Sequence, residues 1–262
     1  MVNRTFVFHS YKGGTGKTTI AANLAVMCAQ RGKNVCMLDF DFRAPSLYFL
    51  FKTKPRSGAW LNDFLEDKCT ISNALHKIDI PTEGKLAIGF ANPASDVMRE
   101  INRKDRKWWA TVLRRLLDTK RAILGDLGFD LLFFDTSPGI HDSSMNALAV
   151  SDMIVLTLKR DELDVEGTKE LIEWFYKRLG RQTAMIINRV LFQPNAPVAN
   201  DQEERLSEEV HGKFGFPVVG VIPCFCDLLI DGSHLLYSLE KPDHPFVERL
   251  SMIADVMEKP GE

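Results

Sequence analysis

Long apolar runs, a cysteine framework and a strong net charge are all missing from this 262-residue sequence. No window approaches the roughly 18 consecutive apolar residues that a membrane-spanning helix needs. The N-terminal segment MVNRTFVFHS is too short in apolar length for a signal peptide. A net charge of −2 gives no global attraction to nucleic acid or to a membrane surface, so any such contact must be local. We therefore expect a soluble, cytoplasmic protein.

The five cysteines are odd in number and unevenly spaced, which excludes a disulfide framework and suits a reducing compartment. Only Cys224 and Cys226 lie close together, separated by one residue. Two chains could supply four such thiolates to one metal ion, although zinc sites normally show two residues between paired cysteines. The alternative is a pair of partly buried free thiols, because cysteine often packs as a small apolar residue.

Seven short apolar runs have the continuous pattern of strands that are buried on both faces. They cover residues 5–10, 34–40, 85–91, 129–135, 152–158, 183–188 and 217–223. Helical patterns lie between them, at 17–31, 94–124, 141–149, 164–178, 203–214 and 244–258. This alternation predicts an α/β fold, a mostly parallel sheet with helices on both faces. No composition break marks a linker, so we expect one domain over residues 1–262, with 41–84 and 190–202 the least regular parts.

A glycine-rich segment, YKGGTGKTT at residues 11–19, follows the first predicted strand and opens the first predicted helix. This context is typical of a phosphate-binding loop, in which backbone N–H groups surround phosphate oxygens and the helix N-terminus adds positive potential. Lys17 would neutralise the β- and γ-phosphates, and Thr18 would offer its hydroxyl to Mg²⁺. The residues expected around the nucleotide are Gly13, Gly14, Thr15, Gly16, Lys17, Thr18 and Thr19.

The loop departs from the pattern G-x-x-x-x-G-K-[ST] because Tyr11 stands at the first glycine position and Lys12 precedes the glycines. Lys17 already serves the phosphates, so a second lysine must point elsewhere. Lys12 could reach the nucleotide of a neighbouring subunit and stabilise charge on the transferred phosphoryl group. It could equally be a solvated surface lysine, and residue chemistry alone does not decide.

The segment KGGTGKTT at 12–19 resembles the deviant Walker A motif of the MinD/ParA group of P-loop ATPases. In that group the early lysine crosses the interface of a dimer that encloses two ATP molecules. The resemblance implies that Lys12 is catalytic in the partner subunit together with the partner's own phosphate-loop lysine, equivalent to Lys17. It also implies ATP and Mg²⁺ as cofactors and a nucleotide-dependent homodimer.

Two acidic motifs end predicted strands, VCMLDFDF with Asp39 and Asp41, and FDLLFFD with Asp135. Ligands bind beyond the carboxyl ends of parallel strands, and a spacing of two places Asp39 and Asp41 on one side. Carboxylates at a metal–phosphate site hold Mg²⁺-bound water and orient the attacking water. The resemblance implies that Asp39 and Asp135 serve the metal with Thr18, and that Asp41 in switch I positions the nucleophile. The Asp39–Asp41 pair could otherwise be simple strand-end caps.

The segment DTSPG at 135–139 resembles the D-x-x-P-G switch II of the same group. The resemblance implies that the Gly139 amide senses the γ-phosphate, and the Pro138–Gly139 turn could shift when that phosphate leaves. Asn188 ends the strand at 183–188, where the group places an asparagine that contacts adenine. An amide suits that role because it offers a donor and an acceptor, but an Asx-turn in a loop is the alternative.

The segment 99–121 holds nine basic and three acidic residues and is interrupted by Trp108 and Trp109. Such a patch could bind DNA or a protein regulator. The alternative is one long amphipathic helix with a solvated basic face. Its buried residues would be Trp109, Val112, Leu113, Leu116 and Leu117.

The last predicted helix carries an apolar stripe that we expect in the core, formed by Phe246, Leu250, Ile253 and Met257. Its polar face carries Glu248, Asp255 and Glu258, whereas interfacial helices are rich in lysine and arginine, so a membrane contact is not expected. Together the motifs predict an ATPase. The resemblance to the MinD/ParA group implies that it is slow without a partner and acts in DNA partitioning or spatial positioning. The alternative is an accessory ATPase in metallocentre assembly that uses Cys224 and Cys226, as some relatives in the group use paired cysteines.

Overall fold

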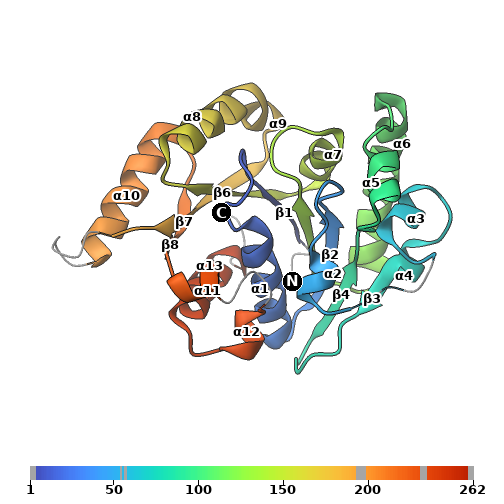
Figure 1. Cartoon of the computed structure of the whole chain (residues 1–262), viewed down its shortest axis with the longest axis horizontal. Coiled ribbons are helices and arrows are strands. Elements are labelled where there is room, and N and C mark those ends of the chain that lie inside the picture. The colour runs from blue at the N-terminus through green and yellow to red at the C-terminus, as the bar shows by residue number, and fades with distance from the viewer. Residues whose placement is uncertain (1–3, 54, 56–57, 193–198, 231–234, 259–262) are drawn as a thin grey trace.

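A computed structural model of the chain describes residues 4–53, 55, 58–192, 199–230 and 235–258. Eight strands form one sheet in the order β3-β4-β2-β5-β1-β6-β7-β8 (Figure 1). The strands are β1 (Arg4–His9), β2 (Asn34–Phe40), β3 (Leu75–Lys77), β4 (Lys85–Gly89), β5 (Leu131–Thr136), β6 (Met153–Lys159), β7 (Gln182–Val190) and β8 (Val218–Pro223). All neighbouring pairs are parallel except β3 with β4, which confirms the predicted mostly parallel sheet.

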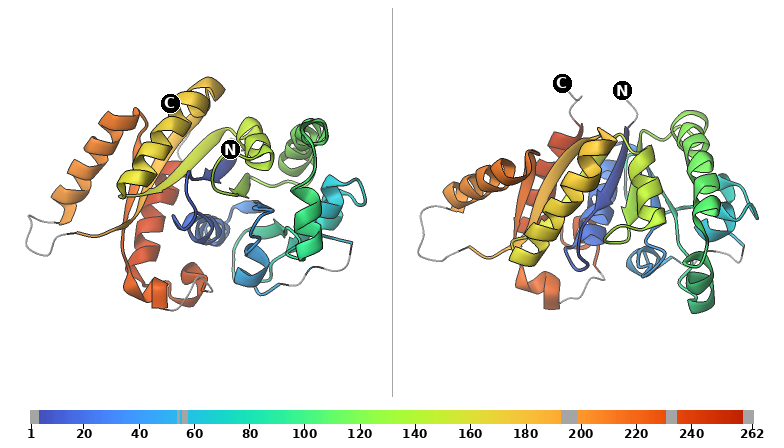
Figure 2. Two further views of the ribbon diagram at one scale, coloured as in Figure 1. Left: turned by 45° about the horizontal axis from the view of Figure 1, so that its top comes forward. Right: turned by 90° about the horizontal axis from the view of Figure 1, so that it is seen from above.

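Helices cover both faces of the sheet, as the alternating pattern predicted (Figures 1 and 2). One face packs against α1 (Lys17–Gln30), α12 (Tyr237–Glu240) and α13 (Pro245–Glu258). The other packs against α6 (Arg106–Arg121), α7 (Asp142–Val150), α8 (Glu162–Leu171) with its continuation η2 (Ile172–Tyr176), and α10 (Ala199–Phe214). The remaining short helices are α2 (Leu47–Leu50), α3 (Leu61–Leu65), α4 (Ile71–Ala74), α5 (Ser95–Ile101), η1 (Ala122–Asp126), α9 (Lys177–Leu179) and α11 (Cys226–Ile230).

Two apolar cores lie on the two faces, because successive side chains of a strand point to opposite sides. Phe133 of β5 packs with Phe6 and Phe8 of β1 on the α1 side, whereas its neighbour Phe134 faces the other core with Phe40. The stripe of α13 lies in the first core, where Phe246, Leu250, Ile253 and Met257 are buried. That prediction is confirmed. No helix in the described residues has the length and apolarity to cross a membrane.

The helix predicted over 94–124 is wrong in its continuity, since α5 ends at Ile101 and α6 begins at Arg106. The Asp105 carboxylate caps α6 by accepting the Trp108 N–H at 2.9 Å, which starts a new helix there. Trp109, Val112 and Leu116 are buried and Leu113 is partly buried, as expected of an amphipathic helix. Leu117, however, is 44% exposed, so its predicted place in the core is wrong.

The two segments predicted as least regular have different outcomes. Residues 41–84 hold the short helices α2, α3 and α4 and the strand β3, which pairs antiparallel with β4 and was not predicted. In 190–202, residues 193–198 lie outside the described part of the chain, and α10 begins at Ala199 rather than at 203.

Candidate functional site: the phosphate loop and its acidic partners

The predicted site residues meet at the carboxyl end of the three central strands. Asp39 of β2 and Asp135 of β5 lie opposite each other in the sheet register, and Phe8 of β1 lies beside Asp135. The phosphate loop leaves β1 at this level and leads into α1 at Lys17. The parallel register therefore brings both predicted acidic motifs to the phosphate loop, as the strand-end argument required.

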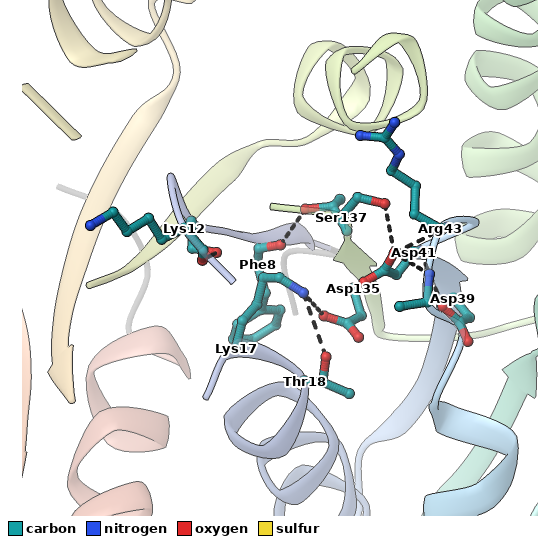
Figure 3. A network of polar contacts seen from close by, with 12 residues as sticks. Phe8, Lys12, Lys17, Thr18, Asp39, Asp41, Arg43, Asp135 and Ser137 are labelled. Atoms are coloured by element: carbon teal, nitrogen blue, oxygen red, sulfur yellow. Dashed lines mark hydrogen bonds and ion pairs between the residues drawn. The ribbon is translucent and has the colours of Figure 1, made fainter. Parts of the chain in front are cut away.

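Lys17 and Asp135 form a buried ion pair at the centre of the site (Figure 3). Lys17 Nζ donates to Asp135 Oδ1 at 2.7 Å, and the two side chains are 6% and 1% exposed. Lys17 Nζ also lies 3.5 Å from the Thr18 hydroxyl. Burial raises the pKa of Asp135, and the adjacent ammonium of Lys17 opposes that rise. The lysine is thus fixed where phosphates would meet the loop.

Two carboxylate oxygens in this site are buried and have no hydrogen-bond partner among the described residues, Oδ2 of Asp39 and Oδ2 of Asp135. Burial raises the pKa of Asp39, and the neighbouring carboxylates of Asp135 and Asp41 raise it further. Such oxygen atoms beside the Thr18 hydroxyl are the ligand type that Mg²⁺ and its bound waters prefer. The residues therefore fit the predicted metal, whose charge would offset the repulsion among the carboxylates.

Asp41 connects the two predicted switch segments, because its Oδ1 accepts hydrogen bonds from both. The Ser137 hydroxyl of switch II donates to it at 2.7 Å, and the backbone N–H groups of Arg43 and Ala44 donate at 3.2 and 3.0 Å (Figure 3). Asp39 Oδ1 in turn accepts the Asp41 N–H at 3.1 Å. Ser137 was not predicted from the sequence as a site residue, although its place two residues after Asp135 was the available signal.

Lys12 is not brought to this group of residues. Figure 3 shows its side chain directed away from Lys17 and Asp135. Lys12 Nζ lies 3.4 Å from Asp161 Oδ1, at the N-terminal cap of α8, and the side chain is 35% exposed. Lys12 is thus a partly exposed lysine held at the edge of the site, a position open to a second subunit.

Tyr11, the residue that departs from the usual loop pattern, packs on α8. A Cβ atom added to Gly167 would lie 1.9 Å from the Tyr11 ring, so only glycine leaves room for that ring. The residues before and after Tyr11 are also linked, because the Ser10 hydroxyl donates to the Lys12 carbonyl at 2.9 Å. The start of the loop is therefore anchored to α8.

Gly139 of switch II has a φ of 77°, a backbone conformation that favours glycine. Its N–H donates to the Ser10 carbonyl at 2.8 Å. Its carbonyl accepts from Nε2 of His9 at 2.9 Å, an interaction that was not predicted from the sequence. For the Gly139 amide to reach a γ-phosphate, it must release the Ser10 carbonyl.

Asn188 contacts the phosphate loop from β7. Its Nδ2 donates to the Thr15 carbonyl at 2.7 Å, and its Oδ1 accepts the Arg189 N–H at 2.9 Å. A pocket beside it is also lined by Gly16, Thr19 and Pro223. Further lining residues include Cys224, Phe225, Leu228 and Tyr237. This apolar pocket adjoins the phosphate loop, and residues after Pro223 line part of it.

In the segment 99–121, here called the basic segment, contacts within the fold engage part of the positive charge. Lys104 lies 2.8 Å from a carboxylate oxygen of Glu66 and 3.1 Å from one of Glu100, and Arg115 donates to the Phe64 and Leu65 carbonyls. Within the described residues, no ion pair is recorded for the exposed side chains of Arg103, Arg106 and Lys107. Arg99 in α5 and Arg114 in the middle of α6 are also exposed, with no ion pair recorded in the described part of the chain. The available cations therefore extend along α5 and α6, with Arg103, Arg106 and Lys107 around the start of α6.

Cys224 and Cys226 are free thiols, the first partly buried and the second exposed. No group of three or more histidine, cysteine, aspartate or glutamate side chains suited to a metal ion occurs in the described part of the chain. A metal held by these cysteines is therefore not supported by the arrangement within one subunit.

The chain is similar to a protein family, to individual relatives and to solved structures, and these similarities agree with one another. A family described as "AAA domain" matches residues 3–186. The septum site-determining protein MinD of Synechocystis is 26% identical over 223 residues, covering 85% of this chain and 76% of the relative. The chromosome-partitioning ATPase Soj of Treponema pallidum is 26% identical over 212 residues, covering 80% and 76%.

The fold is also that of a solved structure, MinD of Pyrococcus horikoshii complexed with Mg-ADP, with a TM-score of 0.77. The match has 19% sequence identity and covers 98% of this chain and 96% of the other. Its fold likeness agrees with the family match and with the phosphate loop, whose lysine pairs with the acidic residue of the switch II motif. The chain belongs to the AAA domain family matched over residues 3–186, and its fold is that of MinD/ParA P-loop proteins.

Proposed function

We propose that the chain binds ATP with Mg²⁺ and hydrolyses it to ADP and phosphate, slowly when alone, as a nucleotide-dependent homodimer. The observation that carries the proposal is the buried Lys17–Asp135 pair beneath the phosphate loop, beside oxygens of Asp39 and Asp135 that lack a partner within the residues that the structure describes. A cation for phosphates and oxygen ligands for a metal thereby meet at one point. We assign this chemistry to one ATPase domain over residues 1–262 that works in the cytoplasm.

Each predicted site residue has a role in this proposal. Gly13 to Thr19 would surround the phosphates, and Thr18, Asp39 and Asp135 would hold Mg²⁺ or its waters. Asp41 would orient the attacking water, since it is buried beside the loop and held by Ser137. Asn188 and the pocket beside it would take the adenine.

Lys12 would complete the site of the partner subunit. Its exposure and its outward direction support this role, because a lysine committed to its own phosphates would point inward (Figure 3). To act across an interface, Lys12 must exchange the Asp161 carboxylate for phosphate oxygens of the partner's nucleotide. The predicted consequence is a dimer that exists with ATP and dissociates after hydrolysis.

Within this ATPase, we favour a role in DNA partitioning or in positioning a cellular structure. The similarity to relatives named for chromosome partitioning and septum site determination supports it. Metallocentre assembly is not favoured, because it relied on Cys224 and Cys226 and neither the described residues nor these relatives add to that case.

The experiment is fluorescence anisotropy of random-sequence duplex DNA titrated with the Asp41→Ala protein, in ATP·Mg²⁺ and in ADP. A partitioning role predicts salt-sensitive binding in ATP only, because the trapped dimer doubles the number of basic segments on one DNA. Absence of binding in both nucleotides would contradict DNA partitioning and leave positioning on a protein scaffold. Wild-type protein in ADP is the matched control for binding that does not depend on the dimer.

A further inference from the structure

His9, at the end of β1, links switch II to the helical segment η2 through both nitrogens of its ring. Nε2 lies 2.9 Å from the carbonyl oxygen of Gly139, and Nδ1 contacts the hydroxyl of Tyr176. Both side chains are 1% exposed. The function proposed above uses neither of these buried groups, although His9 directly contacts the Pro138–Gly139 turn, the part of switch II that is expected to move.

The donors and acceptors of this chain of contacts follow from chemistry. A carbonyl oxygen only accepts, so Nε2 of His9 must carry the hydrogen. Burial lowers the pKa of His9 to about 3, so the ring is neutral near pH 7 and carries only that one hydrogen. Nδ1 is therefore the acceptor, and the Tyr176 hydroxyl donates to it. The order is Tyr176 hydroxyl to His9, and His9 to the Gly139 carbonyl.

The contact with His9 restrains the carbonyl group of Gly139 but not its N–H group. The Gly139 N–H belongs to the peptide group that follows Pro138, and it donates to the Ser10 carbonyl at 2.8 Å. The Gly139 carbonyl belongs to the next peptide group. His9 holds this oxygen at 2.9 Å, and the Ser144 hydroxyl lies 3.1 Å from it. Because glycine tolerates large changes in φ, the amide can rotate away from Ser10 while the carbonyl stays in place.

We propose that His9, braced by Tyr176, is a positioning residue that holds the Gly139 carbonyl as the fixed point of switch II. This inference rests on the proposed ATPase function, in which the Gly139 amide meets the γ-phosphate. With the carbonyl held, the amide moves by a local rotation. Without His9, this carbonyl keeps only the Ser144 hydroxyl, which lies 3.1 Å from it and also 3.0 Å from the His141 carbonyl. The turn is then held less firmly, and the amide reaches the phosphate less often.

Neighbouring contacts hold His9 and the end of β1 in place. Tyr11, two residues after His9, packs against Gly167, and Tyr176 lies nine residues further along the same α8–η2 segment. The end of β1 is thus seated on α8–η2 at two separate positions. The brace on His9 therefore comes from a packed helix rather than from a loop.

Three variants test the proposal. Tyr176→Phe removes only the hydroxyl that orients the ring. His9→Met removes the donor to Gly139 while filling much of the space, and His9→Gln keeps an N–H donor of similar reach. The matched control is Tyr48→Phe, since the structure records no hydrogen bond for the Tyr48 hydroxyl among the described residues.

We expect kcat for ATP hydrolysis to fall about fivefold in Tyr176→Phe and about tenfold or more in His9→Met, because a misplaced stabilising group is costly. His9→Gln should recover much of the loss. KM for ATP should stay within about twofold in all variants, since Lys17 and the phosphate loop are untouched. A kcat equal to that of wild type and of Tyr48→Phe in both Tyr176→Phe and His9→Met would overturn the proposal. If His9→Met does not fold, Tyr176→Phe decides.

Hydrogen exchange separates this inference from the ATPase proposal. In Tyr176→Phe, peptides covering 136–145 should exchange faster than in wild type, with ADP and with a non-hydrolysable ATP analogue alike. Unchanged exchange there would contradict the role of His9 even if the wild-type protein hydrolyses ATP. A wild-type protein that neither binds nor hydrolyses ATP would instead refute the proposed function, and the exchange comparison would still test His9.

Discussion

Asp39 and Asp135 lie opposite each other on neighbouring strands, and each keeps one buried carboxylate oxygen that no group in the described part of the chain contacts by a hydrogen bond. The pKa of both carboxyls is raised, mainly by burial. Two such groups in one buried site are costly unless a cation lies between or beside them. The pair therefore has a testable consequence for stability with and without Mg²⁺.

Asp39→Asn should stabilise the metal-free protein and weaken its response to Mg²⁺. The asparagine side chain keeps an oxygen for the Asp41 N–H but removes a buried negative charge, so we expect the free energy of unfolding to rise by about 1–3 kcal/mol. Urea denaturation with and without Mg²⁺·ADP measures both effects. A Mg²⁺·ADP stabilisation as large as that of wild type would contradict the assignment of Asp39 to the metal.

Lys12→Ala should abolish ATP hydrolysis and leave nucleotide binding intact. Lys12 points away from Lys17 and Asp135, so its loss removes no contact to the nucleotide of its own subunit. Hydrolysis and binding of a fluorescent ATP analogue are measured side by side. Lys85→Ala, at an exposed lysine that begins β4, is the control. Full residual hydrolysis in Lys12→Ala would remove the argument for a lysine acting across the interface.

Asp41→Ala should trap the ATP-bound dimer, because Mg²⁺ and phosphate contacts remain while the attacking water loses its acceptor. Size-exclusion chromatography with light scattering in ATP·Mg²⁺ measures the mass. Ser137→Ala gives a graded comparison, since it removes one hydrogen bond to Asp41 and leaves the carboxylate. A monomeric Asp41→Ala protein in ATP would show that Asp41 is needed for assembly rather than for hydrolysis.

Neutralising Arg103, Arg106 and Lys107 should weaken any DNA binding and reduce its salt dependence. Three lost phosphate contacts would lower the slope of log affinity against log salt by about 2–3 units. Lys104 belongs to the same basic segment, but its pairing with Glu66 and Glu100 predicts a smaller effect for Lys104→Ala. An unchanged salt slope in the triple variant would show that this surface does not face DNA.

The sheet and the acidic site could be predicted because their signals are local. Each strand of the parallel core is a continuous apolar run, and Asp39, Asp41 and Asp135 directly follow such runs. The break between α5 and α6 was missed because it depends on Asp105, whose cap competes with a continuous apolar stripe. β3 was missed because three residues give too little pattern, and its pairing with β4 is tertiary.

The contacts of His9 could not be predicted from the sequence for a different reason. A single histidine at a strand end has no characteristic spacing, and its partners Gly139 and Tyr176 lie 130 and 167 residues away along the chain. Only the parallel arrangement of β1 beside β5 and β6 brings the three together. The same arrangement excludes water from the ring, which gives His9 a measurable effect on stability.

The free energy of unfolding should fall with acid more steeply in wild type than in His9→Gln. Burial lowers the pKa of His9 to about 3 in the folded protein, from an ordinary value of 6.5. Between these values the unfolded chain binds a proton that the folded protein does not. The contribution of neutral His9 to the free energy of unfolding is therefore fully present above pH 6.5 and is lost as the pH falls towards 3.

On going from pH 7 to pH 5, wild type should lose about 2 kcal/mol more than His9→Gln, since about 1.5 pKa units at about 1.4 kcal/mol each separate pH 5 from the unfolded value. Urea denaturation at the two values measures the difference. The carboxyls of Asp39 and Asp135, whose raised pKa acts in the opposite direction, are common to both proteins and cancel in the comparison. Equal acid dependence in the two proteins would mean that the His9 ring accepts a proton in the folded state. Nδ1 would then donate to the Tyr176 hydroxyl, which would reverse the assigned direction of that contact.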